Sequence, residues 1–109
     1  MEKPHLSVSW KIERQRCICK LAGEIDVLTI AKLGREFRKF IQQPELPREL
    51  LWDVKDVTFI DSAAISSLVV FSRTFSHVTG GMAKLLHPQP FLIRVLVITG
   101  LDMAFEIEP

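Results

Sequence analysis

An acid, a serine and a histidine are the side chains of this sequence that could support nucleophilic chemistry: Asp61, Ser62 and His77. A serine nucleophile needs a histidine within hydrogen-bond reach as its general base. The apolar spacing from residue 62 onward predicts one helix, which places Ser62 and His77 about 20 Å apart at opposite ends. The sequence also lacks the G-x-S-x-G turn of the α/β-hydrolases. We therefore predict no hydrolytic site and no enzyme.

Two further acids, Glu24 and Asp26, follow a predicted strand and could be read as paired carboxylates for acid–base catalysis. Acids in this position more often cap the helix that comes next. Asp26 or Thr29 is placed to cap a helix that begins near Ile30. We therefore interpret Glu24 and Asp26 as residues that shape the end of a strand.

Cys17 and Cys19 are the only cysteines of the chain. On a strand, residues i and i+2 point to the same face, so the two thiols are not oriented to form a disulfide with each other. A zinc site takes about four ligands, and the sequence has only three histidines to add to the cysteines. We interpret both residues as reduced core thiols, predict no metal site, and expect a cytosolic compartment.

Composition and charge argue against nucleic acids and membranes as partners. The 109 residues carry a formal net charge of +1, and the densest basic stretch, residues 35–39, is interrupted by Glu36. A nucleic-acid-binding domain normally has a basic stripe. Residues 1–5 have no apolar signal core, and no apolar run approaches the ~20 residues that span a bilayer. We therefore expect a cytoplasmic protein with no direct nucleic-acid contact and no membrane insertion.

No cofactor is expected either. The one glycine pair, Gly80-Gly81, lacks the Lys and the Ser or Thr that a phosphate-binding loop needs. It is placed instead to end the helix that begins at Ser62.

The periodicity of the apolar residues changes several times along the chain and defines the elements that must position these side chains. The predicted elements are strands over 6–12 and 17–21, a helix over 30–41, a strand over 50–54 that continues through 57–60, a helix over 62–79, a strand over 82–86, a helix over 90–98 and a last strand around 104–107. The order is ββαβαβαβ. Single helices between strands predict an α/β domain over residues 1–109, with a mixed, mostly parallel sheet.

Two segments carry a family resemblance. Gly-Glu-Ile-Asp at 23–26 and Val-Thr-Phe-Ile-Asp-Ser at 57–62 resemble the two signature segments of the STAS domain in bacterial anti-sigma factor antagonists, which are also called anti-anti-sigma factors. Residues 91–96, 99–102 and 105–107 are similar to the third helix and the closing strand of that family. The resemblance extends in order over nearly the whole chain, and it implies a single STAS domain with its helices packed mainly on one side.

The resemblance implies that Ser62 is the serine that an anti-sigma factor with serine-kinase activity phosphorylates. A helix N-terminus can hold a phosphate, but the added charge of about −1.5 to −2 beside Asp61 would disturb a surface that closes on a partner. We therefore expect phosphorylation to switch the interface and not the fold. The residues expected to bind the partner, together with the loop after Gly23, are Asp26, Asp61, Ser62, Ala63, Ala64, Ser66 and Arg73.

Ala63 and Ala64 depart from the family pattern, in which Ser or Thr and then Gly follow the phosphorylated serine. If that Gly permits close approach of the partner, Ala64 alters the choice of partner, and docking can persist without phosphorylation. Ser62 or Asp61 can also be read simply as the cap of the helix. Two functions therefore stay open: an antagonist that regulates transcription, or a non-switching STAS subunit of a lipid-transport ABC complex or a stress-signalling scaffold. In either role we expect a monomer or a weak dimer.

Overall fold

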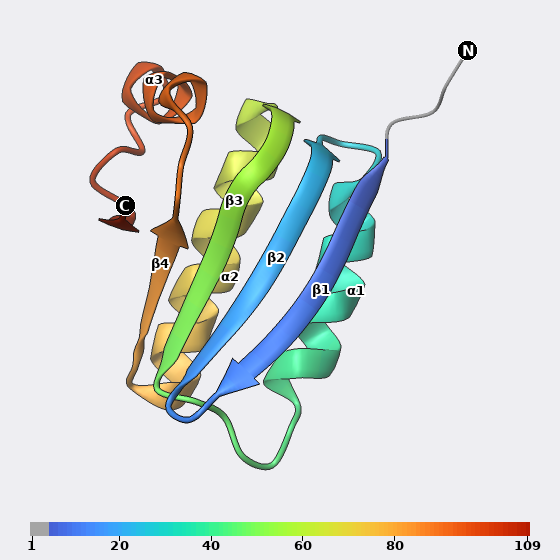
Figure 1. Ribbon diagram of the computed structural model, residues 1–109, viewed down its shortest axis with the longest axis vertical. Coiled ribbons are helices and arrows are strands. Elements are labelled where there is room, and N and C mark those ends of the chain that lie inside the picture. Colours follow the sequence, from blue (N-terminus) through green and yellow to red (C-terminus); the bar gives the residue numbers. More distant parts are fainter. Residues whose placement is uncertain (1–4) are drawn as a thin grey trace.

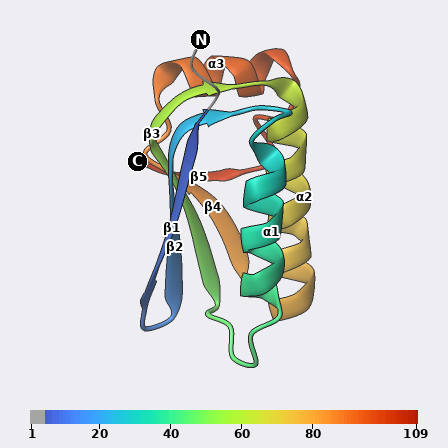
Figure 2. The ribbon, with the colours of Figure 1, turned by 90° about the vertical axis from the view of Figure 1, so that its right-hand side faces the viewer.

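The computed structural model describes residues 5–109, and residues 1–4, part of the segment without a signal core, lie outside them. Two helices cover one face of a five-stranded sheet, and a third lies across its end (Figure 1, Figure 2). The elements are β1 (Leu6–Glu13), β2 (Arg16–Ile25), α1 (Ile30–Ile41), β3 (Glu49–Ile60), α2 (Ser62–Thr79), β4 (Met82–Leu86), α3 (Pro90–Ile98) and β5 (Glu106–Glu108). This confirms the predicted order ββαβαβαβ.

The strands lie in the order β1-β2-β3-β4-β5. β1 and β2 form an antiparallel hairpin, and each of the other neighbouring pairs is parallel. The parallel strands are joined by helices because a strand that runs in the same direction as its neighbour needs a long crossover. The predicted mixed and mostly parallel sheet is therefore confirmed.

The core lies between the sheet and the two long helices. Trp52 of β3 is fully buried, and its indole N–H donates a hydrogen bond of 2.9 Å to Ser72 Oγ of α2. Stacked rings join β1 to α1 through Trp10 and Phe40, whose centroids are 4.6 Å apart. Leu51, between two core-facing residues of β3, is also fully buried, so this central strand is covered on both faces there, as is typical of parallel sheets.

Cys17 and Cys19 are buried free thiols on the helix-covered face of β2, as predicted. Burial raises the pKa of Cys17 to about 11 and raises the pKa of Cys19 well above its usual range. Because the thiolate is the reactive form, both residues are held as unreactive apolar side chains.

Two strands differ from the prediction. β2 was expected to end at residue 21 and continues to Ile25, so Gly23 and Glu24 lie within it. The last strand was expected around 104–107 and is found at Glu106–Glu108, paired with β4. The preceding residues close the end of α3 instead, because the Leu101 N–H donates to Leu96 O at 2.8 Å and the Phe105 side chain is buried. No helix within residues 5–109 is long and apolar enough to cross a membrane.

Candidate partner-binding site

Asp61 joins two segments at the junction between β3 and α2. Its extended backbone ends the strand, and its Oδ1 accepts a hydrogen bond of 2.8 Å from the Ala64 N–H, so Asp61 is the N-cap of α2. Its Oδ2 accepts a second bond, of 3.2 Å, from the Val27 N–H in the loop between β2 and α1. One carboxylate therefore fixes the start of α2 and holds the β2–α1 loop against it.

Ser62 is the first residue of α2 and is exposed. The capping bond comes from Asp61, so the interpretation of Ser62 as the N-cap is wrong and that of Asp61 is correct. The backbone of Asp61 explains the choice, because its N–H still donates to Ile25 O of the sheet while its carbonyl already accepts from the Ile65 N–H of the helix. The Ser62 hydroxyl is thus on the surface, within the first helical turn.

Asp26 lies in the β2–α1 loop and is only 9% exposed. Its Oδ1 accepts hydrogen bonds from the backbone N–H groups of Leu28 and Thr29, at 2.9 and 3.0 Å. Thr29 occupies the N-cap position of α1 without a capping bond, because its hydroxyl donates to Glu24 O at 2.7 Å. Asp26 therefore shapes the loop that Asp61 holds, and its carboxylate is directed inward.

Ser62, Ser66 and Arg73 lie along one exposed stripe of α2. At 100° per residue their directions fall within about 40° of one another, and Arg73 is about 16 Å from Ser62 along the helix axis. Ala63 is exposed beside Ser62, whereas the Ala64 side chain is fully buried. The Ala64 methyl group therefore faces the core and lies beneath the surface that a partner could touch.

Four exposed apolar residues on the elements that meet at this site were not predicted from the sequence. Val27 and Leu28, in the loop held by Asp61, are 70% and 71% exposed. Phe59, two residues before Asp61, and Val70 of α2 are also exposed. Val27 and Leu28 could have been found, because two adjacent apolar residues between a predicted strand and a predicted helix indicate an exposed apolar patch. Phe59 and Val70 gave no such signal, because each lies within a mostly apolar element.

The acidic side chains at this junction bind backbone N–H groups and not one another. Asp61 and Asp26 are committed to backbone N–H groups, and His77 lies in the last turn of α2, far from Ser62. Within residues 5–109, no three His, Cys, Asp or Glu side chains are grouped so that they could hold a metal ion. The arrangement offers a surface hydroxyl and exposed apolar side chains on a rigid junction, which suits protein contact.

The sequence profile of the STAS domain family matches residues 8–109. The fold is similar to that of an anti-sigma factor antagonist from Mycobacterium paratuberculosis, with a TM-score of 0.82 and 22% identity over 96% of this chain and 86% of that chain. Two structures of SpoIIAA are also similar. The unphosphorylated anti-sigma factor antagonist has a TM-score of 0.72 and 19% identity, over 94% of this chain and 89% of that chain.

The second SpoIIAA structure, of the Bacillus cell fate determinant in its phosphorylated form, has a TM-score of 0.69 and 20% identity, over 94% of this chain and 92% of that chain. At these identities the structures establish the fold. The family profile covers all but the first seven residues, including the 23–26 and 57–62 segments and the junction that Asp61 holds. The chain therefore belongs to the STAS domain family.

Proposed function

We propose that this chain is an anti-sigma factor antagonist that binds an anti-sigma factor with serine-kinase activity and is released when Ser62 is phosphorylated. The observation that carries the proposal is the exposed position of Ser62 at the start of a helix that Asp61 caps while it also holds the β2–α1 loop. The shared fold with the antagonist SpoIIAA, known in unphosphorylated and phosphorylated forms, supports it.

The partner surface consists of the exposed stripe of α2, the exposed part of the β2–α1 loop and the start of α2. Covering the exposed apolar side chains of Val27 and Leu28 stabilises the complex with the partner. Ser66 and Arg73 supply polar contacts. Asp26 and the Ala64 side chain support this surface from beneath.

The switch follows from charge. A phosphoryl group on Ser62 adds about −1.5 to −2 next to the Asp61 carboxylate. The positive end of the helix dipole tolerates this charge in the free domain, so the fold persists. In the complex the charge would be desolvated against the partner, which costs several kcal/mol unless the partner neutralises it.

The test is a titration of wild type, Ser62→Asp and Ser62→Ala against the candidate anti-sigma kinase, with and without ATP. Ser62→Asp is expected to bind about a hundredfold more weakly, while Ser62→Ala binds like wild type without ATP and accepts no phosphate with ATP. Gln15→Asp, which adds the same charge at the exposed turn between β1 and β2, is the control for charge and should bind normally.

Equal binding by all variants, with no phosphate in wild type, would sink the switch and favour a non-switching STAS subunit. Ser66→Ala controls for site choice, because it should still accept phosphate at Ser62.

The position of the surface is tested separately at Arg73. Reversing its charge with Arg73→Glu should weaken partner binding while the free energy of unfolding changes by no more than about 0.5 kcal/mol, since the residue is exposed. Arg35→Glu, at a position of α1 that is also exposed, is the matched control and should bind like wild type. Unchanged binding by Arg73→Glu would mean that the partner uses another face.

A further inference from the structure

β1 is the outermost strand on one side of the sheet and pairs with β2 alone. Figure 2 views the molecule from this side, with β1 toward the viewer. The Glu24 N–H donates to His5 O at 2.8 Å, and the backbone groups of an antiparallel strand alternate in direction from residue to residue. The backbone N–H and C=O groups of His5, and of every second residue after it, therefore point toward β2. The N–H and C=O groups of Val8, Trp10 and Ile12 face outward.

Lys32 of α1 confirms this alternation and limits the free edge. Its Nζ donates to Leu6 O at 2.7 Å, so the first outward carbonyl of β1 already has a partner. The unpaired run is therefore Val8 to Ile12, centred on Trp10.

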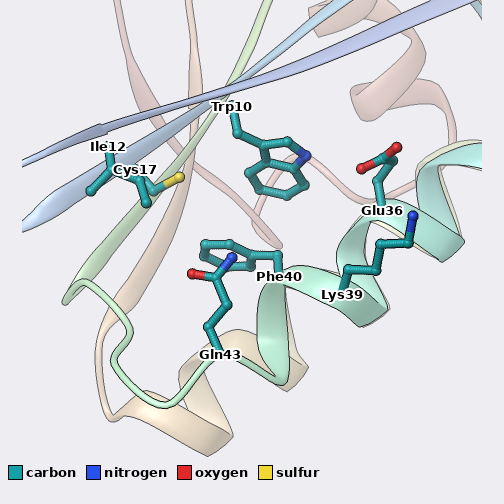
Figure 3. A pocket seen from close by; sticks show the side chains of 7 residues that line it. All are labelled: Trp10, Ile12, Cys17, Glu36, Lys39, Phe40 and Gln43. Carbon is teal, nitrogen blue, oxygen red and sulfur yellow. The ribbon is translucent and has the colours of Figure 1, made fainter.

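The side chains of the same residues make this edge apolar. Ile12 is 61% exposed, and Trp10 stacks on Phe40 beside a cavity of about 140 Å³ between β1 and α1 (Figure 3). Ile12, Trp10 and Phe40 line this cavity on its apolar side, and Glu36, Lys39 and Gln43 line it on the side of α1.

Monomeric proteins usually protect an outer strand with charged side chains, above all lysine, with proline, or with a covering element. Residues 8–12 of β1 have a single charged side chain, Lys11, which pairs with Glu13 of the same strand at 3.0 Å. Within the described chain they have no proline and no element that covers their outward backbone groups.

We propose that this edge binds the same edge of a second copy of the chain, antiparallel, so that the two sheets become one. With the two-fold axis at Trp10, Val8 pairs with Ile12 of the second copy, Trp10 with Trp10 and Ile12 with Val8. Each of these pairs exchanges two hydrogen bonds, so every free group from Val8 to Ile12 is satisfied. Val8 of the second copy then covers the exposed Ile12.

Charge selects this register over its neighbours. The register with the two-fold axis at Trp10 also fixes the pairs on the other face of β1. There Ser9 lies opposite Lys11 of the second copy, and Ser7 lies opposite Glu13 of the second copy, so no like charges are directly opposed. A shift that pairs Trp10 with Ile12 opposes Lys11 to Lys11, which is unfavourable. The shift the other way pairs Ile12 with Leu6, whose carbonyl Lys32 already occupies. The edge thus complements itself, which favours a second copy over an arbitrary extended peptide.

The dimer should be weak, because one strand pair is smaller than a standard protein interface. Sedimentation equilibrium of the full chain from about 10 µM to about 1 mM should show reversible dimerisation. Val8→Pro removes an outward N–H that β2 does not use, as proline allows at an outer strand, and should weaken dimerisation about tenfold or more. Val8→Ala keeps that N–H and should dimerise nearly as wild type does.

A chain that stays monomeric throughout this range overturns the proposal, and so does undiminished dimerisation by a folded Val8→Pro. Circular dichroism shows whether Val8→Pro folds, and a second measurement does not depend on it. In the proposed register Ser9 lies directly opposite Lys11 of the second copy, and these two residues share no backbone hydrogen bond. The Cβ atoms of such a pair are about 4.5–5.5 Å apart, close enough for a disulfide after a small adjustment.

A mixture of Ser9→Cys and Lys11→Cys chains should therefore form a mixed disulfide faster than either variant forms one alone. Cys17 and Cys19 are fully buried and do not interfere. Equal rates in the mixture and in the separate variants would overturn the proposed register. α2 packs against β3 and β4, away from this edge, so this result and that of the Ser62 titration are independent.

Discussion

At the scale of single residues, Asp61 and Ser62 are adjacent but have different tasks. Asp61 holds both the helix start and the β2–α1 loop, whereas Ser62 is exposed at the first helical position. Asp61→Ala should lower the free energy of unfolding by about 1–2 kcal/mol, because an N-cap bond is lost and the Val27 N–H loses its partner. Ser62→Ala should change it by no more than about 0.5 kcal/mol. Urea denaturation of the two variants measures the difference.

Asp61→Asn is the matched variant for this comparison, because its side-chain oxygen can still accept the Ala64 N–H bond. It should lose less stability than Asp61→Ala. A Ser62→Ala variant as unstable as Asp61→Ala would contradict the assignment of the cap to Asp61.

The sequence could not decide between Asp61 and Ser62 as the cap, because aspartate and serine are about equally good N-caps. The decision depends on where β3 ends, and that is set by the bond from the Asp61 N–H to Ile25 O on a neighbouring strand. Asp61 was therefore fixed as the cap by a long-range pairing that no local pattern reveals. Asp26 differs, because its carboxylate accepts from the N–H groups of Leu28 and Thr29 in its own loop, a local arrangement.

At the scale of elements, two glycines of the helices differ in what they contribute. Gly80 ends α2 with a φ of 72°, a left-handed conformation that favours glycine. Gly34 lies inside α1, where an added Cβ would meet the nearest atoms, of Arg38 and Phe71, at 3.6 and 3.7 Å, which is ordinary contact.

Gly34→Ala should therefore raise the melting temperature, because alanine is the better helix former by about 1 kcal/mol. Gly80→Ala should lower the stability by about 1 kcal/mol, because alanine strains the left-handed cap. Thermal unfolding followed by circular dichroism measures both, and each variant serves as the control for the other. A rise for both variants would mean that the end of α2 relaxes without its glycine.

The elements themselves were largely predictable from the sequence. The helices begin at Ile30, Ser62 and Pro90, as predicted, because the 3.6-residue period and the turn residues agree there. The last strand begins two residues later than predicted. Ala104 and Phe105, whose apolar side chains suggested a strand, instead pack against the core after the end of α3. The candidate site was predictable only in part, since residues 27 and 61 are brought together by the sheet.

At the scale of the whole molecule, ion pairs tie four strands together on the face of the sheet without helices. Arg16 of β2 pairs with Glu108 of β5 at 2.8 Å and with Glu49 of β3 at 3.2 Å, and Glu49 also pairs with Lys84 of β4 at 3.4 Å. The hydrogen bond from Arg16 to Glu108 raises the pKa of the guanidinium group. These side chains are partly exposed, so solvent and salt screen each pair.

Arg16→Gln should lower the free energy of unfolding at low salt by at most about 1 kcal/mol, and the difference from wild type should shrink at about 1 M salt. Urea titrations at the two salt concentrations measure this. Lys11→Gln is the control, because the Lys11 side chain is 73% exposed in its pair with Glu13 and should contribute no measurable stability. A deficit in Arg16→Gln that is independent of salt would mean that Arg16 acts by covering apolar surface instead.

The last strand, β5, has a consequence for how far the sheet can be extended. It is three residues long, and two of the three are glutamates. An edge this short and this acidic repels an added strand, whereas the opposite edge of the sheet is long and apolar. A chain with two receptive edges could polymerise head to tail without limit, as fibrils do. Because one of its edges is closed, this chain can join neighbours by strand addition only until the open edge is used, and growth then stops.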